Sequence, residues 1–285
     1  MLFTNVTPYR FSKEFRVDDT ELEMKLGESM VREMGDHESY IFGWDKYNKL
    51  AESLFLEIGG CYLLKLVKLE KVIPNSAINK ELADRIDVIE SENSYKVGRK
   101  QKQELKDQIF MERLPTAMVV EKPVYICIDV PNQTLIVNTS SANSSDDATS
   151  YLRKTLGSLP IVPMVSESSP ALRMTSWISG NEKLPENFQI LNTAKLRNSE
   201  GVSVSFTDFV IDDYIADLVG QGMECKELRM SFKEEATFTL TSDLKIKTIK
   251  WDFDDDNEYD DALDAMHSTF YILSHKVNNI ISKLM

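Results

Sequence analysis

The sequence has few of the residues that build metal sites and disulfides. Its 285 residues include three cysteines and three histidines. They are Cys61, Cys127, Cys225, His37, His267 and His275. No two of them have the spacing of a structural zinc site, and the cysteines form no CxxC pair. We therefore expect free, buried thiols in a reducing cytoplasm and no metal cofactor.

The sequence also lacks the short motifs of many nucleotide-dependent and hydrolytic enzymes. GxGxxG, GxxxxGK[ST], GxSxG and HExxH are all absent, which excludes the sites that those motifs build. No uncharged apolar run approaches the roughly 20 residues of a membrane span. Residues 1–5 show neither the basic nor the apolar region of a secretory signal. We expect a cytoplasmic protein without cofactors and without membrane contact.

Acidic residues outnumber basic ones. The chain has 33 Lys and Arg against 46 Asp and Glu, a net charge of −13. This balance excludes a uniformly basic coat for nucleic acid, but it permits a basic face on an acidic body. Hydrophobic residues make up 42% of the chain, which is enough to bury a sizeable core in one large domain or two modest ones.

Hydrophobic periodicity predicts helices and antiparallel hairpins in the first half of the chain. Two apolar runs joined by Gly59-Gly60 predict a tight hairpin, because both turn positions need positive φ. Two helices are expected, one after Pro74 and one over 97–113. They carry few large apolar residues, so we predict a helix pair that projects from the body. The other expected elements are a strand over 3–9 and a helix over 20–34.

The second half shows the same mixture. A hairpin should turn at Pro131-Asn132, and a helix capped by Asp146-Asp147 should end at Gly157. The runs 224–232, 236–241 and 245–253 predict an antiparallel meander. This mixed order predicts an α+β fold of antiparallel sheets with packed helices. The expected parts are 1–75, the helix pair 76–116 as a tip, and 117–285.

The last segment predicts a long helix with one apolar side. Its apolar residues recur three and four positions apart. They are Leu263, Met266, Phe270, Leu273, Val277, Ile280 and Leu284. This seam is expected to pack against the chain's own sheet, which is the commoner outcome, or against a second subunit.

An acidic run precedes that helix and invites a calcium interpretation. It contains Asp252, Asp254, Asp255, Asp256, Glu258, Asp260 and Asp261. An EF-hand loop needs glycine at its sixth position and glutamate at its twelfth. Counted from Asp252 these positions are Asn257 and Leu263, so the motif fails. We interpret the run as a solvated loop that caps the last helix.

One pattern is typical of metal-dependent nucleases. Glu224 and Lys226 form an ExK, preceded by Asp212, Asp213 and Asp217. Nucleases use carboxylates to hold Mg²⁺ and a lysine to stabilise charge on the phosphate. A three-residue pattern arises often by chance in a chain of which 28% is charged. The alternative is a solvated strand face, which we favour, and we expect no enzyme activity.

The densest basic cluster lies on the predicted helix pair. It consists of Lys96, Arg99, Lys100, Lys102 and Lys106. Glu104 and Asp107 lie among them and reduce the local excess to three positive charges. Smaller clusters are formed by Arg10, Lys13 and Arg16 and by Arg153 and Lys154. Such a cluster is either a solvated helix face or a contact for nucleic-acid phosphates.

Residues 151–163, with the sequence YLRKTLGSLPIVP, closely resemble a signature of the RdgC family of recombination-associated proteins. Other segments of this chain resemble that family in the same order along nearly its whole length. They include residues 1–3, 43–44, 70–74, 105–107, 114–115, 188–191, 246–251 and 270–273. We identify the chain as a divergent member.

The resemblance implies a non-specific double-stranded DNA-binding protein. Family members form a homodimer closed into a ring, with an acidic outside and a basic hole that encircles duplex, and they restrain the recombinase RecA. The resemblance also implies a cytoplasmic, nucleoid-associated protein without cofactors. Its expected partners are duplex DNA and a second copy of this chain. The residues expected at the DNA are Lys96, Arg99, Lys100, Lys102, Lys106, Arg10, Lys13, Lys71, Met118, Arg153 and Lys154.

Two segments depart from the family's pattern. Where the family commonly has Leu-Pro-Arg-Ala-Phe, residues 114–118 read LPTAM and lack both the guanidinium and the ring. Residues 204–209 likewise lack a basic stretch. Two alternatives therefore stay open. One is a metal-dependent exonuclease, a label that the family has carried, and the other is a protein-interaction module that has lost DNA binding.

Overall fold

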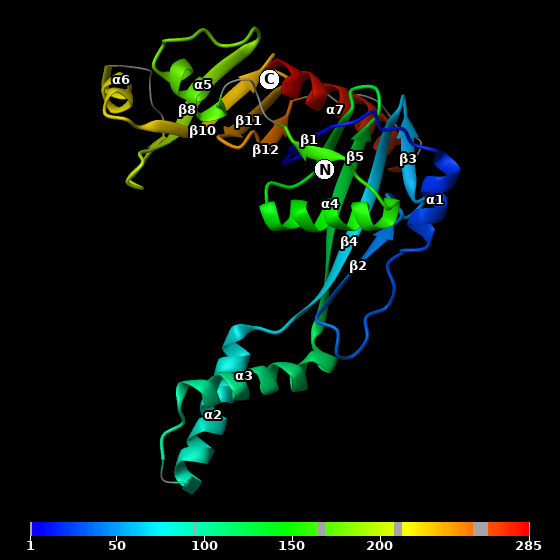
Figure 1. Ribbon diagram of the computed structural model, residues 1–285, viewed down its shortest axis with the longest axis vertical. Coiled ribbons are helices and arrows are strands. Elements are labelled where there is room, and N and C mark those ends of the chain that lie inside the picture. The colour runs from blue at the N-terminus through cyan, green and yellow to red at the C-terminus, as the bar shows by residue number, and fades with distance from the viewer. Residues whose placement is uncertain (1, 94, 165–168, 208–212, 253–261, 285) are drawn as a thin grey trace. The chain divides into compact units, whose positions relative to one another are not determined.

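The computed structural model describes residues 2–93, 95–164, 169–207, 213–252 and 262–284. In this part of the chain the fold is α+β, with two antiparallel sheets, as the sequence predicts (Figure 1). The chain divides into two compact units. The first comprises Met1–Gly27, Lys46–Lys65 and Val124–Met285, and the second Glu28–Asp45 and Leu66–Pro123. The division into 1–75, 76–116 and 117–285 stays a prediction, and residues 253–261 of the acidic run and Asp212 lie outside the described residues.

The larger sheet has the strand order β2-β4-β5-β6-β1-β7, and β3 pairs with β4. Its strands are β1 (Thr7–Phe11), β2 (Tyr40–Asp45), β3 (Phe55–Ile58), β4 (Cys61–Val72), β5 (Met118–Asp129), β6 (Thr134–Val137) and β7 (Ile161–Pro163). Both predicted hairpins are confirmed, and the turn residues Gly59 and Gly60 have φ of 61° and 82°. The first strand starts at Thr7 instead of residue 3, because Val6 exchanges hydrogen bonds of 2.8 and 2.9 Å with Ile246 of the other sheet.

Two helices flank these strands in the first unit, α1 (Asp19–Gly27) and α4 (Ala142–Leu156). The expected cap of α4 at Asp146-Asp147 is wrong. The helix starts four residues earlier, where the Ser141 hydroxyl accepts a 3.3 Å hydrogen bond from the backbone N–H of Ser144. Its end at Gly157 is confirmed, with φ of 82°. The first helix ends at Gly27 and not at residue 34, because the following residues 29–31 bond to β2 instead.

The smaller sheet has the order β12-β11-β10-β8-β9. Its strands are β8 (Phe188–Arg197), β9 (Ser203–Thr207), β10 (Glu224–Phe232), β11 (Ala236–Thr241) and β12 (Ile246–Trp251). The predicted meander is confirmed as β10, β11 and β12. The sequence pattern did not reveal β8 and β9, nor the helices α5 (Pro170–Ile178) and α6 (Asp213–Gly220).

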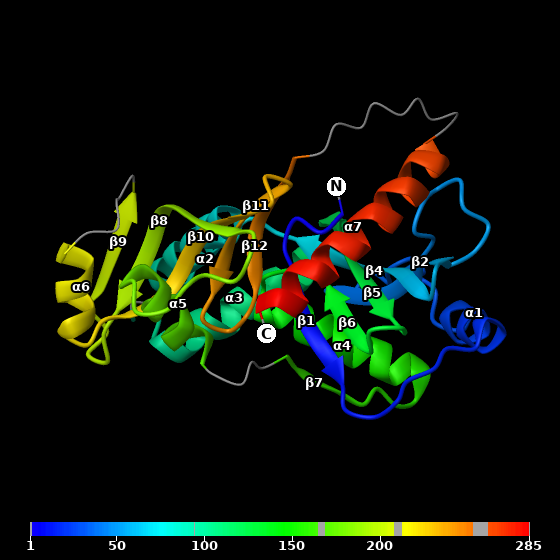
Figure 2. The ribbon, with the colours of Figure 1, turned by 90° about the horizontal axis from the view of Figure 1, so that it is seen from above.

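One side of this smaller sheet contributes to the core of the first unit. Leu228, Met230 and Phe238 are fully buried there, in one apolar cluster with residues of α5 and of the last helix, α7 (Ala262–Leu284). In Figure 2 the red α7 ends beside β12, and Arg173 of α5 donates a 2.6 Å hydrogen bond to the carbonyl oxygen of Leu284. The seam of α7 is thus buried in its own chain and gives no support to a dimer.

The three cysteines are buried, as predicted. Burial raises the pKa of the Cys225 thiol to about 12, and this thiol donates to the carbonyl oxygen of Glu227. A hydrogen bond with Cys61, together with burial, raises the pKa of Cys127. Both Cys127 and Cys225 are therefore protonated at neutral pH, and neither is an activated nucleophile.

The second unit contains β2, parts of β4 and β5, and the two predicted helices. These are α2 (Asn75–Asn93) and α3 (Arg99–Arg113), followed by the short 3-10 helix η1 (Leu114–Thr116). Ile78 of α2 and Ile109 of α3 are buried, whereas most other side chains of the two helices are exposed. Ion pairs join the two helices: Arg85 lies 2.5 Å from Glu112, and Arg113 lies 2.8 Å from Glu81. None of the helices in the described part of the chain is long and apolar enough to cross a bilayer.

A loop before β2 in the second unit is closed by Glu38. Its carboxylate accepts hydrogen bonds of 2.8 and 2.5 Å from the Arg32 guanidinium and one of 2.7 Å from the backbone N–H of Gly35. These bonds, Arg32 first, lower the pKa of Glu38 from 4.5 to about 2.

We expect an NMR titration to show the Glu38 carboxyl ionising near pH 2 instead of 4.5. Because its pKa is lower in the folded state, its stabilising contribution is present above pH 4.5 and is lost as the pH falls toward 2. The Arg32→Gln variant should return the titration toward the ordinary value. A midpoint above 4 in the unmodified protein would show that the loop is open in solution.

Candidate nucleic-acid interface

The predicted basic cluster gathers at the start of α3. Lys96, Arg99, Lys100 and Lys102 are exposed there, and Lys106 is half-buried one turn further on. The helix begins after Gly98, its first turn contains no acidic residue, and no side chain of the described residues caps its N-terminus. The positive end of the helix dipole therefore adds to the four side-chain charges, an arrangement that favours anions.

The neighbouring acidic groups neutralise this cluster only in part. Lys100 and Glu104 lie 3.8 Å apart with both side chains largely in water, so their attraction is weak. Glu90 of α2 accepts a 2.9 Å hydrogen bond from the backbone N–H of Val97 and orders the connection between the helices. The start of α3 thus keeps a local positive charge.

The other predicted DNA-contacting residues of the first unit are exposed. Arg10 lies on β1, Lys13 follows it, and Arg153 and Lys154 occupy the last turn of α4. The Lys154 ammonium lies 5.9 Å from the centre of the Tyr151 ring. These four residues belong to the first unit and the α3 cluster to the second.

Two further predicted residues differ sharply in exposure. Lys71 is only 8% exposed, and its ammonium donates hydrogen bonds of 2.9 and 2.7 Å to the carbonyl oxygens of Gly35 and Asp36. A buried lysine bonded in this way holds a loop in place, so we leave it out of the interface. Met118, at the start of β5, is 74% exposed.

The structure adds a basic surface that sequence reasoning missed, on the side of the smaller sheet that faces away from the core. Side chains alternate across the strands, so residues paired through the register share this side. Lys195 lies opposite both Ser205 and Glu227, and Arg229 lies opposite Thr239. On β12, Lys247 is paired with Thr239 and Lys250 with Thr237, so both lie on the same side. We call this surface the open sheet face.

The open sheet face is positive on an acidic chain. It carries Lys195, Arg197, Lys226, Arg229, Lys247 and Lys250 against Glu224 and Glu227, an excess of four positive charges. Its remaining side chains are mostly hydroxyls: Thr193, Ser203, Ser205, Thr207, Ser231, Thr237, Thr239 and Thr248. Lysine, arginine and hydroxyl side chains are the groups that contact nucleic-acid phosphates.

Four of these basic residues have no ion pair within the described part of the chain: the exposed Lys195, Arg197 and Lys250, and the half-buried Arg229. Lys247 lies 3.2 Å from Glu227 and Lys226 lies 2.6 Å from Glu224. The signal that could have revealed this face is the alternation of Ala194 and Leu196 with basic residues, which is typical of a half-buried strand.

The ion pair between Glu224 and Lys226 weakens the nuclease interpretation of the ExK pattern, because the two side chains neutralise each other at the start of β10. Within the described ranges, no three Asp, Glu, His or Cys side chains lie together as metal ligands. Asp217 lies on α6, while Asp212 is outside the described residues.

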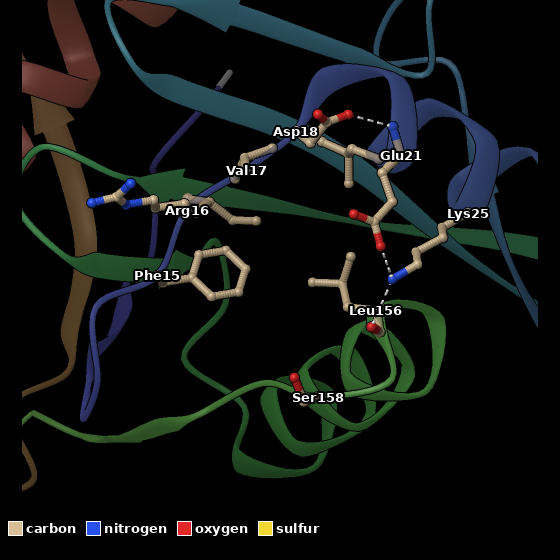
Figure 3. Close-up of a pocket in the computed structure, with 10 residues that line it drawn as sticks. Phe15, Arg16, Val17, Asp18, Glu21, Lys25, Leu156 and Ser158 are labelled. Atoms are coloured by element: carbon tan, nitrogen blue, oxygen red, sulfur yellow. Dashed lines mark hydrogen bonds and ion pairs between the residues drawn. The ribbon is translucent and has the colours of Figure 1, made fainter.

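A small hollow of about 160 Å³ lies between α1 and the end of α4 (Figure 3). Phe15 and Leu156 face each other across it, and Ile128 also lines it. At its rim Lys25 pairs with Glu21 at 2.6 Å and donates a 3.0 Å hydrogen bond to the carbonyl oxygen of Leu156. That lysine caps the end of α4, so its role here is structural.

Comparison with known proteins gives consistent matches along the chain. The family model described as "RdgC: Putative exonuclease, RdgC" matches residues 1–285. The "Recombination-associated protein RdgC" of Tolumonas auensis is 31% identical over 272 residues, covering 94% of this chain and 89% of that protein. The protein of the same name from Haemophilus influenzae is 30% identical over 254 residues, covering 88% and 84%. That of Shewanella halifaxensis is 29% identical over 295 residues, covering 100% and 97%.

Proposed function

Because this chain belongs to the RdgC family, as residues 151–163 predict, we propose that it acts in recombination by binding duplex DNA without sequence preference. The observation that carries the proposal is the open sheet face, an excess of four positive charges on a chain of net charge −13. The exposed start of α3 adds a second basic surface.

The chemistry of both surfaces favours the DNA backbone over the bases. Lysine and arginine contacts to phosphates supply affinity that is independent of sequence and falls with salt. Phosphate contacts position a protein on DNA without reading its bases. The strongly acidic remainder of the chain repels DNA and confines binding to these surfaces.

The finer parts of the proposal rest on the family. We propose a homodimer that closes into a ring around duplex DNA in the nucleoid and thereby limits the access of RecA. A ring would convert weak phosphate contacts into long residence, because the DNA must leave through an opened interface. The apolar side of α7 is used within its own chain, so a dimer must form through other surfaces.

An exonuclease is the second candidate, because the family description names one. It requires that purified protein shorten linear duplex with Mg²⁺ or Mn²⁺. A protein-interaction module without DNA binding is the third candidate.

One binding experiment separates the three candidates. Fluorescence anisotropy with two labelled duplexes of unrelated sequence should give equal affinities, and gels of the same samples with Mg²⁺ should show intact DNA. Shortened DNA would favour the nuclease. In that case the Glu224→Gln variant should leave the duplex intact. The absence of binding even at low salt would favour the interaction module.

A further inference from the structure

Arg229 lies in the middle of the open sheet face, within a ring of threonines. Its Nη2 donates a 2.8 Å hydrogen bond to the hydroxyl of Thr237. Its Nη1 donates to the hydroxyl and the carbonyl oxygen of Thr248 at 2.9 and 3.0 Å, and the Thr239 hydroxyl lies 3.5 Å away. The guanidinium is therefore held in one orientation by three strands.

This guanidinium has no carboxylate partner within the described residues. Lys247 and Lys226 each pair with a glutamate, whereas every oxygen bonded to Arg229 is neutral. Burial lowers the pKa of Arg229, because the half-buried cation has lost part of its hydration. An anion brought to this place would restore the missing counter-charge.

The site keeps donors that its own contacts do not use. A guanidinium has five N–H groups, and the contacts to threonines engage Nη1 and one proton of Nη2. The Nε–H and one proton of Nη2 have no acceptor among the described residues. Nε and Nη2 share one edge of the planar guanidinium, and such an edge binds oxyanions in a bidentate manner. The Thr237 hydroxyl accepts from Arg229, so its own proton is available to donate.

The backbone contributes to this arrangement at Thr248. This residue has φ of 49°, a conformation that a β-branched residue rarely adopts. It lies in the register shift between β11 and β12, where Thr237 pairs with Lys250 and Thr239 with Lys247. Because of this register shift, both the hydroxyl and the carbonyl oxygen of Thr248 accept hydrogen bonds from Arg229. Lys247 and Lys250 are paired with β11 on either side of the shift.

We propose that Arg229, Thr237, Thr239 and Thr248 form a phosphate-binding site that takes one phosphodiester group of a nucleic-acid backbone. The phosphodiester part rests on the proposed function; the oxyanion site itself rests on the geometry. The two free N–H groups of Arg229 bind two phosphate oxygens, and the threonine hydroxyls donate to the same group. Lys250 and Lys247 attract the flanking phosphates.

The first test follows the Arg229 Nε–H signal by NMR and identifies it by its loss in the Arg229→Lys variant. Dimethyl phosphate and inorganic phosphate are added at constant ionic strength, with sodium chloride as the control. A saturable shift with dimethyl phosphate, weakened in Thr237→Val, supports the proposal. An equal response to chloride overturns it, and a response to inorganic phosphate alone overturns its phosphodiester part.

The second test measures duplex affinity over a salt series. Arg229→Lys keeps the charge but loses the bidentate edge, so affinity should fall about tenfold with little change in salt slope. Lys49→Arg, at an exposed residue off the open sheet face, is the control and should bind as the unmodified protein does. Thr237→Val keeps Arg229 but removes one hydroxyl donor, so it should also weaken duplex binding. This second variant tests the site even if Arg229→Lys does not fold.

The outcomes separate this site from the proposed function. Unchanged duplex affinity in both Arg229→Lys and Thr237→Val would overturn the site and leave DNA binding standing. A dimethyl phosphate response in a protein that binds no duplex would support the oxyanion site and overturn the proposed function.

Discussion

Changing Lys195, Arg197 and Lys250 together to Gln is expected to lower duplex affinity on the order of a hundredfold at about 0.15 M salt. All three side chains are exposed on the open sheet face and lie in no ion pair of the described residues, so they are available to phosphates. If each contacts one phosphate, the slope of log affinity against log salt should flatten by roughly 2.7. Fluorescence anisotropy over a salt series measures both quantities.

The control for this variant removes the same charge elsewhere. Lys49, Lys80 and Lys183 are exposed and lie off the open sheet face. Changing them together to Gln alters the net charge equally, so it should leave most of the affinity and slope unchanged. Equal losses in both variants would mean that only total charge matters and that the open sheet face is not the binding surface.

Changing Arg99, Lys100 and Lys102 together to Gln is expected to flatten the salt slope by roughly two to three units. These residues surround the uncapped start of α3, where the helix dipole adds to their charge. Binding at moderate salt should weaken without any change in sequence preference, because phosphate contacts do not read bases. The fold should survive, since exposed charges contribute little to stability.

The opposite charge change provides a control within the same helix. Glu104 and Asp107 are exposed beside the cluster, and Glu104→Gln with Asp107→Asn should strengthen duplex binding. If neither variant alters affinity or slope, the cluster is a solvated helix face. DNA would then contact the open sheet face, with Arg10, Lys13, Arg153 and Lys154 as further candidates.

The parts of the fold that the sequence predicts are those with strong local signals. The turn glycines Gly59 and Gly60 define one hairpin, and the three-four spacing of apolar residues defines α2 and α7. The helix cap at Ser141 was missed because Asp146-Asp147 offered a stronger signal in the same segment. Between residues 164 and 223 the apolar spacing is irregular, and there the helices α5 and α6 and the strands β8 and β9 were not predicted.

The candidate site was predicted in part for a similar reason. The α3 cluster is contiguous in sequence, so its charge can be counted directly. The open sheet face is assembled from strands more than fifty residues apart, such as those of Lys195 and Lys250, and only their register brings the charges to one side. Lys71 is the reverse case, a lysine that the sequence places at the DNA but the structure buries. Nothing in the sequence indicates that its ammonium bonds to loop carbonyl oxygens.

The salt dependence of duplex binding by the unmodified protein tests the central claim most directly. Anisotropy with a labelled duplex of arbitrary sequence, from about 0.05 to 0.2 M salt, covers a range in which several phosphate contacts change affinity by orders of magnitude. We predict tight binding at low salt and a steep linear decline, with a slope near −0.9 for each phosphate contacted. Absence of binding at the lowest salt, or an affinity that does not change across the series, would contradict the account.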